Sequence, residues 1–250
     1  MKVTIITATY NSKKNIKTCL ESVLNQTYKD IEIIIIDGNS NDNTLSVVNS
    51  MLLGYVNSKV ISESDNGIYD ALNKGLKLAS GDIIGFVHSD DILYSPNIIY
   101  EIVDCFSNKS VDGVYGDLLY VNKSNLNHTI RAWKSCEFSY NLLKKGWMPP
   151  HPSLYLKREI YDKFGIFNLD YKISADYDFM LRVFKNTDNK FKYLPKVITK
   201  MRVGGASNRS LKNIIQKTRE DYRAITSNNV GGWISILLKN LSKIKQFRIN

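Results

Sequence analysis

Hydrophobic and polar positions follow two different periods in the first third of the chain. Short apolar runs near 2–7, 31–36, 59–62 and 83–87 are typical of strands. Between them, apolar residues recur every three or four positions, which predicts helices. The run at 31–36 is nearly all isoleucine, which favours a strand covered on both faces. The resulting order, β-α-β-α-β-α-β, predicts an α/β fold with a mostly parallel central sheet flanked by helices.

The second half of the chain is less regular. It predicts helices, strands and a proline-rich loop, but no simple alternation. The expected helices span about 96–106, 156–164, 176–183, 208–224 and 233–249, and the expected strands span 112–115, 118–121, 129–133 and 196–203. We divide the chain into a domain at 1–205, with halves at 1–93 and 94–205, and C-terminal basic amphipathic helices at 206–250.

Composition is ordinary for a globular protein of this size. The chain has 250 residues, of which 43% are hydrophobic and 23% charged. No apolar run reaches the roughly 18 to 20 residues that a membrane span needs, and the first residues lack the pattern of a signal peptide. We therefore expect a cytoplasmic protein. Cys19, Cys105 and Cys136 are widely spaced and suit reduced thiols.

Positive charge is concentrated near the C-terminus. The net charge is +10, and from Arg202 onward ten Lys and Arg face only two acidic residues. In the last helix, Ile234, Leu237, Leu241 and Ile244 share one face, with Lys239 and Lys243 opposite. This pattern is typical of a helix lying on an anionic membrane surface, and equally of one packed on its own domain. No nucleic-acid-binding motif accompanies the charge, so we expect no nucleic acid partner.

Acidic residues follow two of the predicted strands. Asp37 comes after 31–36, and Asp90 and Asp91 come shortly after 83–87. The carboxyl ends of parallel strands meet at the edge where α/β proteins bind ligands. Adjacent carboxylates there suit a hard cation such as Mg²⁺ or Mn²⁺. The alternative is that they cap the helix beginning near Pro96. No dinucleotide fingerprint or P-loop occurs, so a nucleotide would be held by other means.

Two further residues admit both a functional and a structural interpretation. Asp176 stands at a predicted helix start, where it could act as a general base or only complement the helix dipole. His151 lies in a proline-rich loop, where it could contact a ligand or only form a structural hydrogen bond. The sequence leaves both choices open.

Four separated motifs together resemble the family 2 glycosyltransferases, which have the GT-A fold. They are Ala8-Thr9-Tyr10-Asn11, Asp37-Gly38-Asn39-Ser40, Ser89-Asp90-Asp91 and Ala175-Asp176-Tyr177-Asp178. The segment from Ser64 to Gly75 is similar to the version in bacterial surface-polysaccharide transferases, and His151-Pro152-Ser153 also resembles a family segment. The resemblance covers about residues 1–205.

The resemblance implies a role for each matching residue. Asp37 would hold the base of the nucleotide, and the backbone near Ala8 and Tyr10 would line the nucleotide pocket. Asp90 would contact the ribose, and Asp91, with Asp90, would bind Mn²⁺ or Mg²⁺. Asp176 would be the general base. The remaining matches add three expected donor-binding residues: Asp65, Asn73 and Ser89.

The implied activity is inverting, metal-dependent transfer of a single sugar from a nucleotide-diphosphate sugar. The donor would be a UDP-sugar by family tendency, and the acceptor a glycan or lipid-linked glycan of bacterial polysaccharide, lipopolysaccharide or capsule synthesis. Such an enzyme would work at the inner membrane face. Ala175 replaces a frequent Glu of the family, and the Q-x-x-R-W signature of processive synthases is absent. The alternative is a catalytically silent sugar-nucleotide-binding or scaffold protein.

Overall fold

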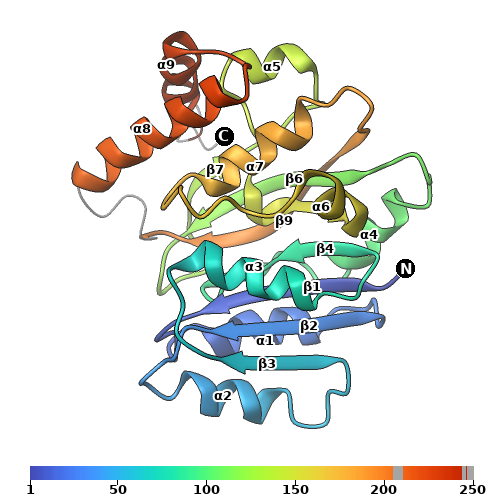
Figure 1. Cartoon of the computed structure of the whole chain (residues 1–250). Helices are drawn as coiled ribbons and strands as arrows, with labels where there is room; N and C mark the ends of the chain where they lie inside the picture. The colour runs from blue at the N-terminus through green and yellow to red at the C-terminus, as the bar shows by residue number, and fades with distance from the viewer. Residues whose placement is uncertain (205–210, 244–245, 247–250) are drawn as a thin grey trace.

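The computed structural model describes residues 1–204, 211–243 and 246, so the predicted positions at 205–210, at Ile244 and beyond 246 lie outside the described residues. Its strands form one nine-stranded sheet with helices on both faces (Figure 1). The strand order is β3-β2-β1-β4-β8-β6-β9-β5, with β7 beside β6. Because β3, β2, β1 and β4 are parallel, their carboxyl ends meet at one edge, on the left in Figure 1.

The first half of the chain has the predicted order of elements. They are β1 (Val3–Thr9), α1 (Ile16–Leu24), β2 (Ile31–Asp37), α2 (Thr44–Met51), β3 (Ser58–Ser62), α3 (Ile68–Leu78) and β4 (Ile83–Phe86). Alternate residues of a strand face opposite sides of the sheet. Ile34 and Ile36 therefore pack against α3, whereas Ile33 and Ile35 pack on the side of α1. The isoleucine run is thus buried on both faces, as predicted.

The second half contains β5 (Asp91–Leu93), α4 (Ile98–Cys105), β6 (Gly113–Val121), β7 (Thr129–Trp133), α5 (Tyr140–Lys144), η1 (His151–Ser153), β8 (Leu154–Lys157), α6 (Arg158–Phe164), α7 (Ala175–Phe184) and β9 (Phe191–Arg202). The helix predicted at 156–164 begins as a strand, because Leu156 pairs with Ile84 on one side and Gly113 on the other. The strands predicted at 112–115 and 118–121 are one continuous strand, β6.

The acidic pair lies in a turn and does not simply end a strand. β4 ends at Phe86, and the backbone N–H of Asp91 donates to the carbonyl of His88 at 2.8 Å. This turn redirects the chain, and Asp91 opens β5, where it pairs with Met201 of β9. The pair is therefore held between two strands of the sheet, close to the carboxyl edge of β4.

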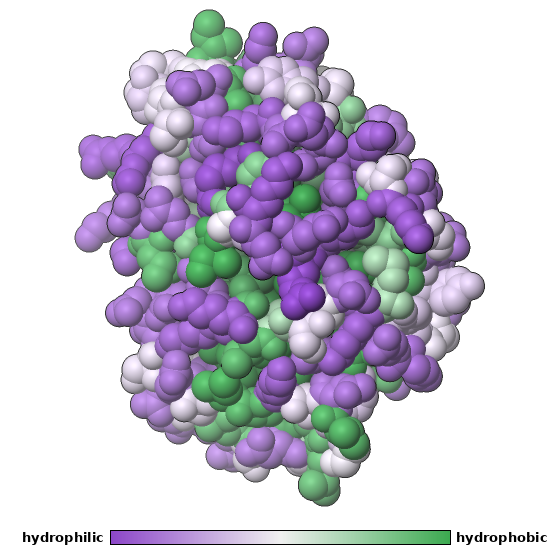
Figure 2. Space-filling view, turned by 45° about the vertical axis from the view of Figure 1, so that its right-hand side comes forward, coloured by the Kyte–Doolittle hydropathy of each residue, from purple (hydrophilic) through white to green (hydrophobic). Residues whose placement is uncertain are grey.

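The C-terminal helices α8 (Leu211–Ser227) and α9 (Trp233–Ser242) continue the fold beyond β9. They lie beside α7, at the top of Figure 1. The apolar side of α9 faces outward: Ile234 and Leu237 are 76% and 60% exposed, whereas Lys239 is buried. Green side chains stand out at the top of Figure 2, over these helices. Within the described residues, no helix has both the length and the apolar character that crossing a membrane requires.

Candidate functional site

Three residues from separate loops meet beside the carboxyl ends of β1 and β2. Gly38 follows β2, and its backbone N–H donates to the carbonyl of Thr9 at 2.9 Å. A β-carbon built on Gly38 would lie 2.5 Å from Oδ2 of Asp65 and 3.5 Å from the ring of Tyr10. Tyr10 is 63% exposed. An exposed aromatic ring and a carboxylate therefore approach a glycine, and a larger side chain at this position would clash with Asp65.

Asp37 was expected to hold the nucleotide base, but its carboxylate is surrounded by protein groups. Its side chain is fully buried, and its oxygens accept hydrogen bonds from the backbone N–H and hydroxyl of Ser40 and from the hydroxyl of Ser62. Asn39, which lies between Asp37 and Ser40 in the sequence, has a positive φ of 61°. The carboxylate therefore fixes the loop that carries Gly38.

Two other expected donor-binding residues are buried. Ala8 pairs with Ile36 inside the sheet, and its side chain is 7% exposed, so only its backbone is near the edge. The Asn73 side-chain amide binds the main chain of Phe167 on both sides, donating to its carbonyl at 2.8 Å and accepting from its N–H at 2.9 Å. We therefore leave Asn73 out of the donor site, because its amide holds α3 against the loop before α7.

Ser89, Asp90 and Asp91 form the turn between β4 and β5. The hydroxyl of Ser89 lies 2.8 Å from that of Ser12, which ties the turn to the loop after β1. Asp90 is half-buried. Asp91 is fully buried, and neither of its carboxylate oxygens has a hydrogen-bond partner among the described residues. Burial, and then the charge of Asp90, raise the pKa of Asp91 well above its usual range.

Arg202, at the end of β9, is a cation that contacts this turn. Its guanidinium donates to the carbonyl of Asp90 at 2.7 Å and to the hydroxyl of Thr18 at 2.8 Å. Its charge lowers the pKa of Asp91, but less than burial raises it. None of the four sequence motifs includes Arg202, which ends a strand that also carries Lys192, Lys196 and Lys200.

The residues at this turn fit a divalent cation. An unpartnered buried carboxylate is costly, and a cation would satisfy it. In the described part of the chain, no cluster of three or more His, Cys, Asp or Glu side chains could enclose a metal. Mg²⁺ is commonly held by one or two carboxylates together with substrate phosphates, so Asp90 and Asp91 would suffice if a bound diphosphate completed the shell.

Asp176 is the second residue of α7, and it is half-buried. The hydroxyl of Tyr69, on α3, lies 2.9 Å from Oδ1 of Asp176 and 2.7 Å from the carbonyl of Ile173. Burial, and then the charge of Asp176, raise the pKa of Tyr69 well above its usual range, so Tyr69 stays a hydrogen-bond donor. The sequence analysis missed Tyr69, although it lies in the segment that resembles polysaccharide transferases.

The neighbouring carboxylate, Asp178, is engaged in packing. It is 5% exposed, and it forms an ion pair with Arg182 at 3.0 Å and accepts from Asn228 at 3.0 Å. Asp176 is therefore the more accessible carboxylate of this motif. That observation favours Asp176 over Asp178 as the candidate base.

His88 and His151 connect the acidic turn to Asp176. Their ring centroids are 6.1 Å apart, and the His151 ring stacks on Phe86 at 5.0 Å. Burial lowers the pKa of His88, and the charges of Asp90 and Asp176 both oppose this. Burial also lowers the pKa of His151, to about 4. The charges of Asp90 and Asp176 therefore both act on the same buried imidazole.

Comparison with known proteins identifies the class. The family model described as Glycosyl transferase family 2 matches residues 4–185. The chain therefore belongs to glycosyltransferase family 2 and is a glycosyltransferase, as the four motifs predicted. The PGL/p-HBAD biosynthesis glycosyltransferase of Mycobacterium tuberculosis is 30% identical over 229 residues, which are 88% of this chain and 87% of that protein. Chondroitin synthase of Pasteurella multocida is 29% identical over 220 residues, but these cover 22% of that protein.

Solved structures confirm the predicted GT-A fold. TarS 1–349 of S. aureus, in complex with UDP-GlcNAc, gives a TM-score of 0.68 at 19% identity over 90% of this chain and 66% of that one. Mannosyltransferase PcManGT of Pyrobaculum calidifontis, in complex with GDP-Man and Mn²⁺, gives a TM-score of 0.64 at 19% identity. The match covers 98% of this chain and 72% of that one. This chain spans 40% of the longer TarS chain that it matches.

Proposed function

We propose that this glycosyltransferase moves one sugar from a nucleotide-diphosphate donor to a hydroxyl of a glycan or lipid-linked glycan, with inversion at the anomeric carbon. One observation carries the proposal: the buried carboxylate of Asp91 has no hydrogen-bond partner among the described residues, and the charges of its neighbour Asp90 and of the half-buried Asp176 both act on His88. A donor-side cation site and an acceptor-side base are the two parts that such a transfer requires.

The donor side would use the loops at the carboxyl edge. The Tyr10 ring and the Asp65 carboxylate would receive the nucleotide around Gly38, with Asp37 holding that loop in place. Asp90, which is half-buried, would meet the ribose. A UDP-sugar is our first choice of donor. UDP-GlcNAc in TarS and GDP-Man in PcManGT are what two proteins of the same fold bind.

Mn²⁺ or Mg²⁺ would be held by Asp91 and Asp90, and it would supply positive charge to the departing diphosphate. The protein residues perform the rest of the reaction. The Asp176 carboxylate takes the proton of the acceptor hydroxyl as that oxygen forms a bond to the anomeric carbon, while the bond from this carbon to the phosphate oxygen breaks. Attack from the side opposite the leaving group inverts the configuration.

The outward face of α9 would place the enzyme on an anionic membrane surface. Its apolar side chains Trp233, Ile234 and Leu237 are more than half exposed, while both acidic residues of α8, Glu220 and Asp221, are buried. Exposed apolar side chains, with the acidic residues of α8 turned inward, match the chemistry of an anionic lipid interface. A lipid-linked acceptor of bacterial polysaccharide synthesis would lie in that surface.

Thermal stability with and without ligands tests the donor site. Wild type, Asp91→Asn and Asp176→Asn are heated with UDP, GDP or dTDP, each with and without Mn²⁺. One nucleotide should stabilise wild type and Asp176→Asn by about 2.7 kcal/mol at a hundredfold excess over Kd, only with metal. Asp91→Asn should lose that metal dependence. Equal stabilisation of all three proteins without metal would contradict the proposed site. Nucleotide binding without turnover of any sugar donor would instead favour a silent binding protein.

Vesicle sedimentation tests the membrane contact. The double variant Ile234→Ser, Leu237→Ser should lose binding to vesicles of phosphatidylcholine with phosphatidylglycerol. The matched control, Leu53→Ser with Val56→Ser, removes apolar side chains that are 86% and 94% exposed beyond α2, and it should bind like wild type. Unchanged binding of the α9 variant would overturn the contact. Loss of a dimer in that variant would assign the face to a second copy of the chain.

A further inference from the structure

We infer that Glu220 of α8 is a positioning residue for Asp176, which makes the C-terminal helix pair part of the catalytic apparatus. The inference rests on the proposed role of Asp176 as the general base. Glu220 is 9% exposed. The hydrogen-bond partners of its carboxylate among the described residues lie in the loop that leads into α7 and in its own helix, at Gln216.

Glu220 accepts hydrogen bonds from three consecutive backbone N–H groups of that loop. The donors are Lys172 at 3.1 Å, Ile173 at 2.8 Å and Ser174 at 2.9 Å. Ser174 is the N-cap of α7, but its side chain makes no capping hydrogen bond to its own helix. The start of α7 is therefore fixed by a carboxylate from another helix, which also suits the positive end of the α7 dipole.

Ile173 links Glu220 to the candidate base. Its N–H binds Glu220, and its carbonyl accepts from the hydroxyl of Tyr69, which also donates to Asp176. Displacing this one residue would move both the helix start and the Tyr69 hydroxyl. A general base must lie within hydrogen-bond reach of the acceptor proton, and a shift of about 1 Å can cost up to about a hundredfold in rate.

Asp221, the next residue, anchors the same helix start to α9. Its Oδ1 accepts from the hydroxyl of Ser174 at 2.7 Å, and its Oδ2 lies 2.8 Å from the ammonium of Lys217 and 3.0 Å from that of Lys239. Lys239 also lies 3.0 Å from the centre of the Tyr177 ring. Charge on both lysines offsets the effect of burial and lowers the pKa of Asp221 to about 2, so this anchor stays ionised at neutral pH.

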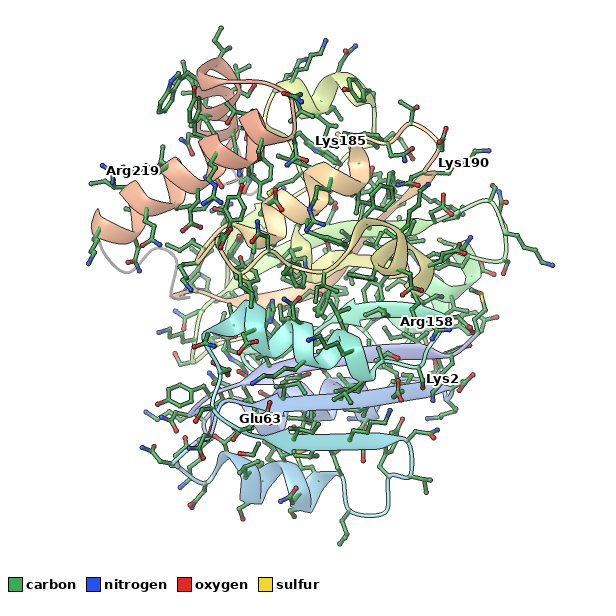
Figure 3. The ribbon with its side chains drawn as sticks, viewed as in Figure 1. Lys2, Glu63, Arg158, Lys185, Lys190 and Arg219 are labelled. Carbon is green, nitrogen blue, oxygen red and sulfur yellow. The ribbon has the colours of Figure 1, made fainter. Side chains whose placement is uncertain are left out.

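The kinetic test compares Glu220→Ala, Glu220→Gln and Arg219→Ala. Figure 3 shows Arg219 on α8 pointing away from the body of the protein, which makes it a matched control. UDP-glucose, UDP-N-acetylglucosamine and GDP-mannose are each supplied with Mn²⁺, and nucleotide release is followed. Glu220→Ala should lower kcat at least about tenfold and leave the donor KM within about twofold, whereas Arg219→Ala should match wild type.

Glu220→Gln keeps an oxygen that can accept from Ile173 and Ser174, so it should fold and recover most of the lost kcat. In the Asp176→Asn background, Glu220→Ala should cause no further loss, because a positioning residue acts only through the base. A kcat within about twofold of wild type for Glu220→Ala, or an equal loss in the Asp176→Asn background, would overturn the inference.

Hydrogen exchange at 172–174 gives a readout that needs no turnover. These amides should exchange faster in Glu220→Ala than in wild type or Arg219→Ala. Unchanged exchange would overturn the inference even if no donor is turned over. If Asp176→Asn retains full activity, the proposed function fails instead, so the two failures are distinguishable.

Discussion

Two buried carboxylates at opposite ends of the sheet have opposite environments. Glu32, at the amino end of β2, accepts from the hydroxyl of Thr4 at 2.6 Å, from the N–H and hydroxyl of Ser80 at 2.8 Å, and from the ammonium of Lys59 at 3.1 Å. Asp91, beyond the carboxyl end of β4, accepts nothing from the described residues. Both residues are at most 3% exposed, so a difference in burial does not explain the difference between their environments.

The pKa values of the two groups reflect this difference. Burial raises the pKa of Glu32, but hydrogen bonds from Thr4, Ser80 and Lys59 outweigh it and lower the pKa to about 2. Burial raises the pKa of Asp91, and the opposing charge of Arg202 is too weak to offset it. Glu32 is thus stabilised by the folded chain alone, whereas the described residues leave both carboxylate oxygens of Asp91 without a hydrogen-bond partner. The comparison supports the proposal that the donor site lies at the carboxyl end of the sheet, whereas Glu32 at the amino end serves stability.

Asp91→Asn should produce the largest effect. Transfer should fall roughly a thousandfold, as when an enzyme loses a group that stabilises developing charge. The free energy of unfolding should not fall, because the variant removes an uncompensated buried charge. Donor turnover and urea denaturation measure the two quantities. A variant that loses stability but keeps its rate would make Asp91 a structural residue like Glu32.

Glu32→Gln should show the reverse pattern. Breaking a buried, paired carboxylate should lower the free energy of unfolding by about 3 kcal/mol, while the rate per folded molecule stays near that of wild type. Glu63→Gln is the control, because Glu63 pairs with Lys74 at 2.8 Å but is half exposed, and exposed pairs contribute at most about 1 kcal/mol. Figure 3 shows Glu63 at the molecular surface. Equal losses in the two variants would contradict the proposed contrast.

His151 should make the carboxyl end sensitive to acid. Its folded pKa of about 4 lies below the unfolded value of about 6.5, so between these values the unfolded chain binds the extra proton and stability falls as pH falls. From pH 6.5 to pH 5 this loss amounts to about 2 kcal/mol. Urea denaturation across this range should show a flatter profile for His151→Gln, with the exposed His128→Gln as control. Identical profiles for wild type and His151→Gln would contradict the assignment.

The parallel half of the fold was predictable because its signals are local. The isoleucines of 31–36 and the spacing of Ala71, Leu72 and Leu76 read correctly as a buried strand and an amphipathic helix. Strand β8 was missed, because Leu154–Lys157 acquires its conformation by insertion between β4 and β6. Such pairing partners are distant in the chain and leave no periodic signal.

The site was predictable only where a motif carried it. The four motifs predicted the family correctly, but the roles of Asp37, Asp90, Asp91 and Asp176 remain predictions. Tyr69 and Glu220 were missed because each acts through a partner about 100 and 50 residues away in sequence. The outward apolar side of α9 also could not be predicted, since the buried ion pair between Lys239 and Asp221 determines which side turns inward.

Gly38→Ala should have the smallest effect, and it tests whether the carboxyl end is a pocket. The added methyl would meet the Asp65 carboxylate at 2.5 Å and the Tyr10 ring at 3.5 Å, so Asp65 would have to move. UDP affinity with Mn²⁺, measured by calorimetry, should weaken by about five- to tenfold, or about 1 kcal/mol. The control is Gly232→Ala, which meets no atom within 4 Å. Unchanged affinity in Gly38→Ala would place the nucleotide away from Tyr10 and Asp65, and leave Asp90 and Asp91 as the residues that define the donor site.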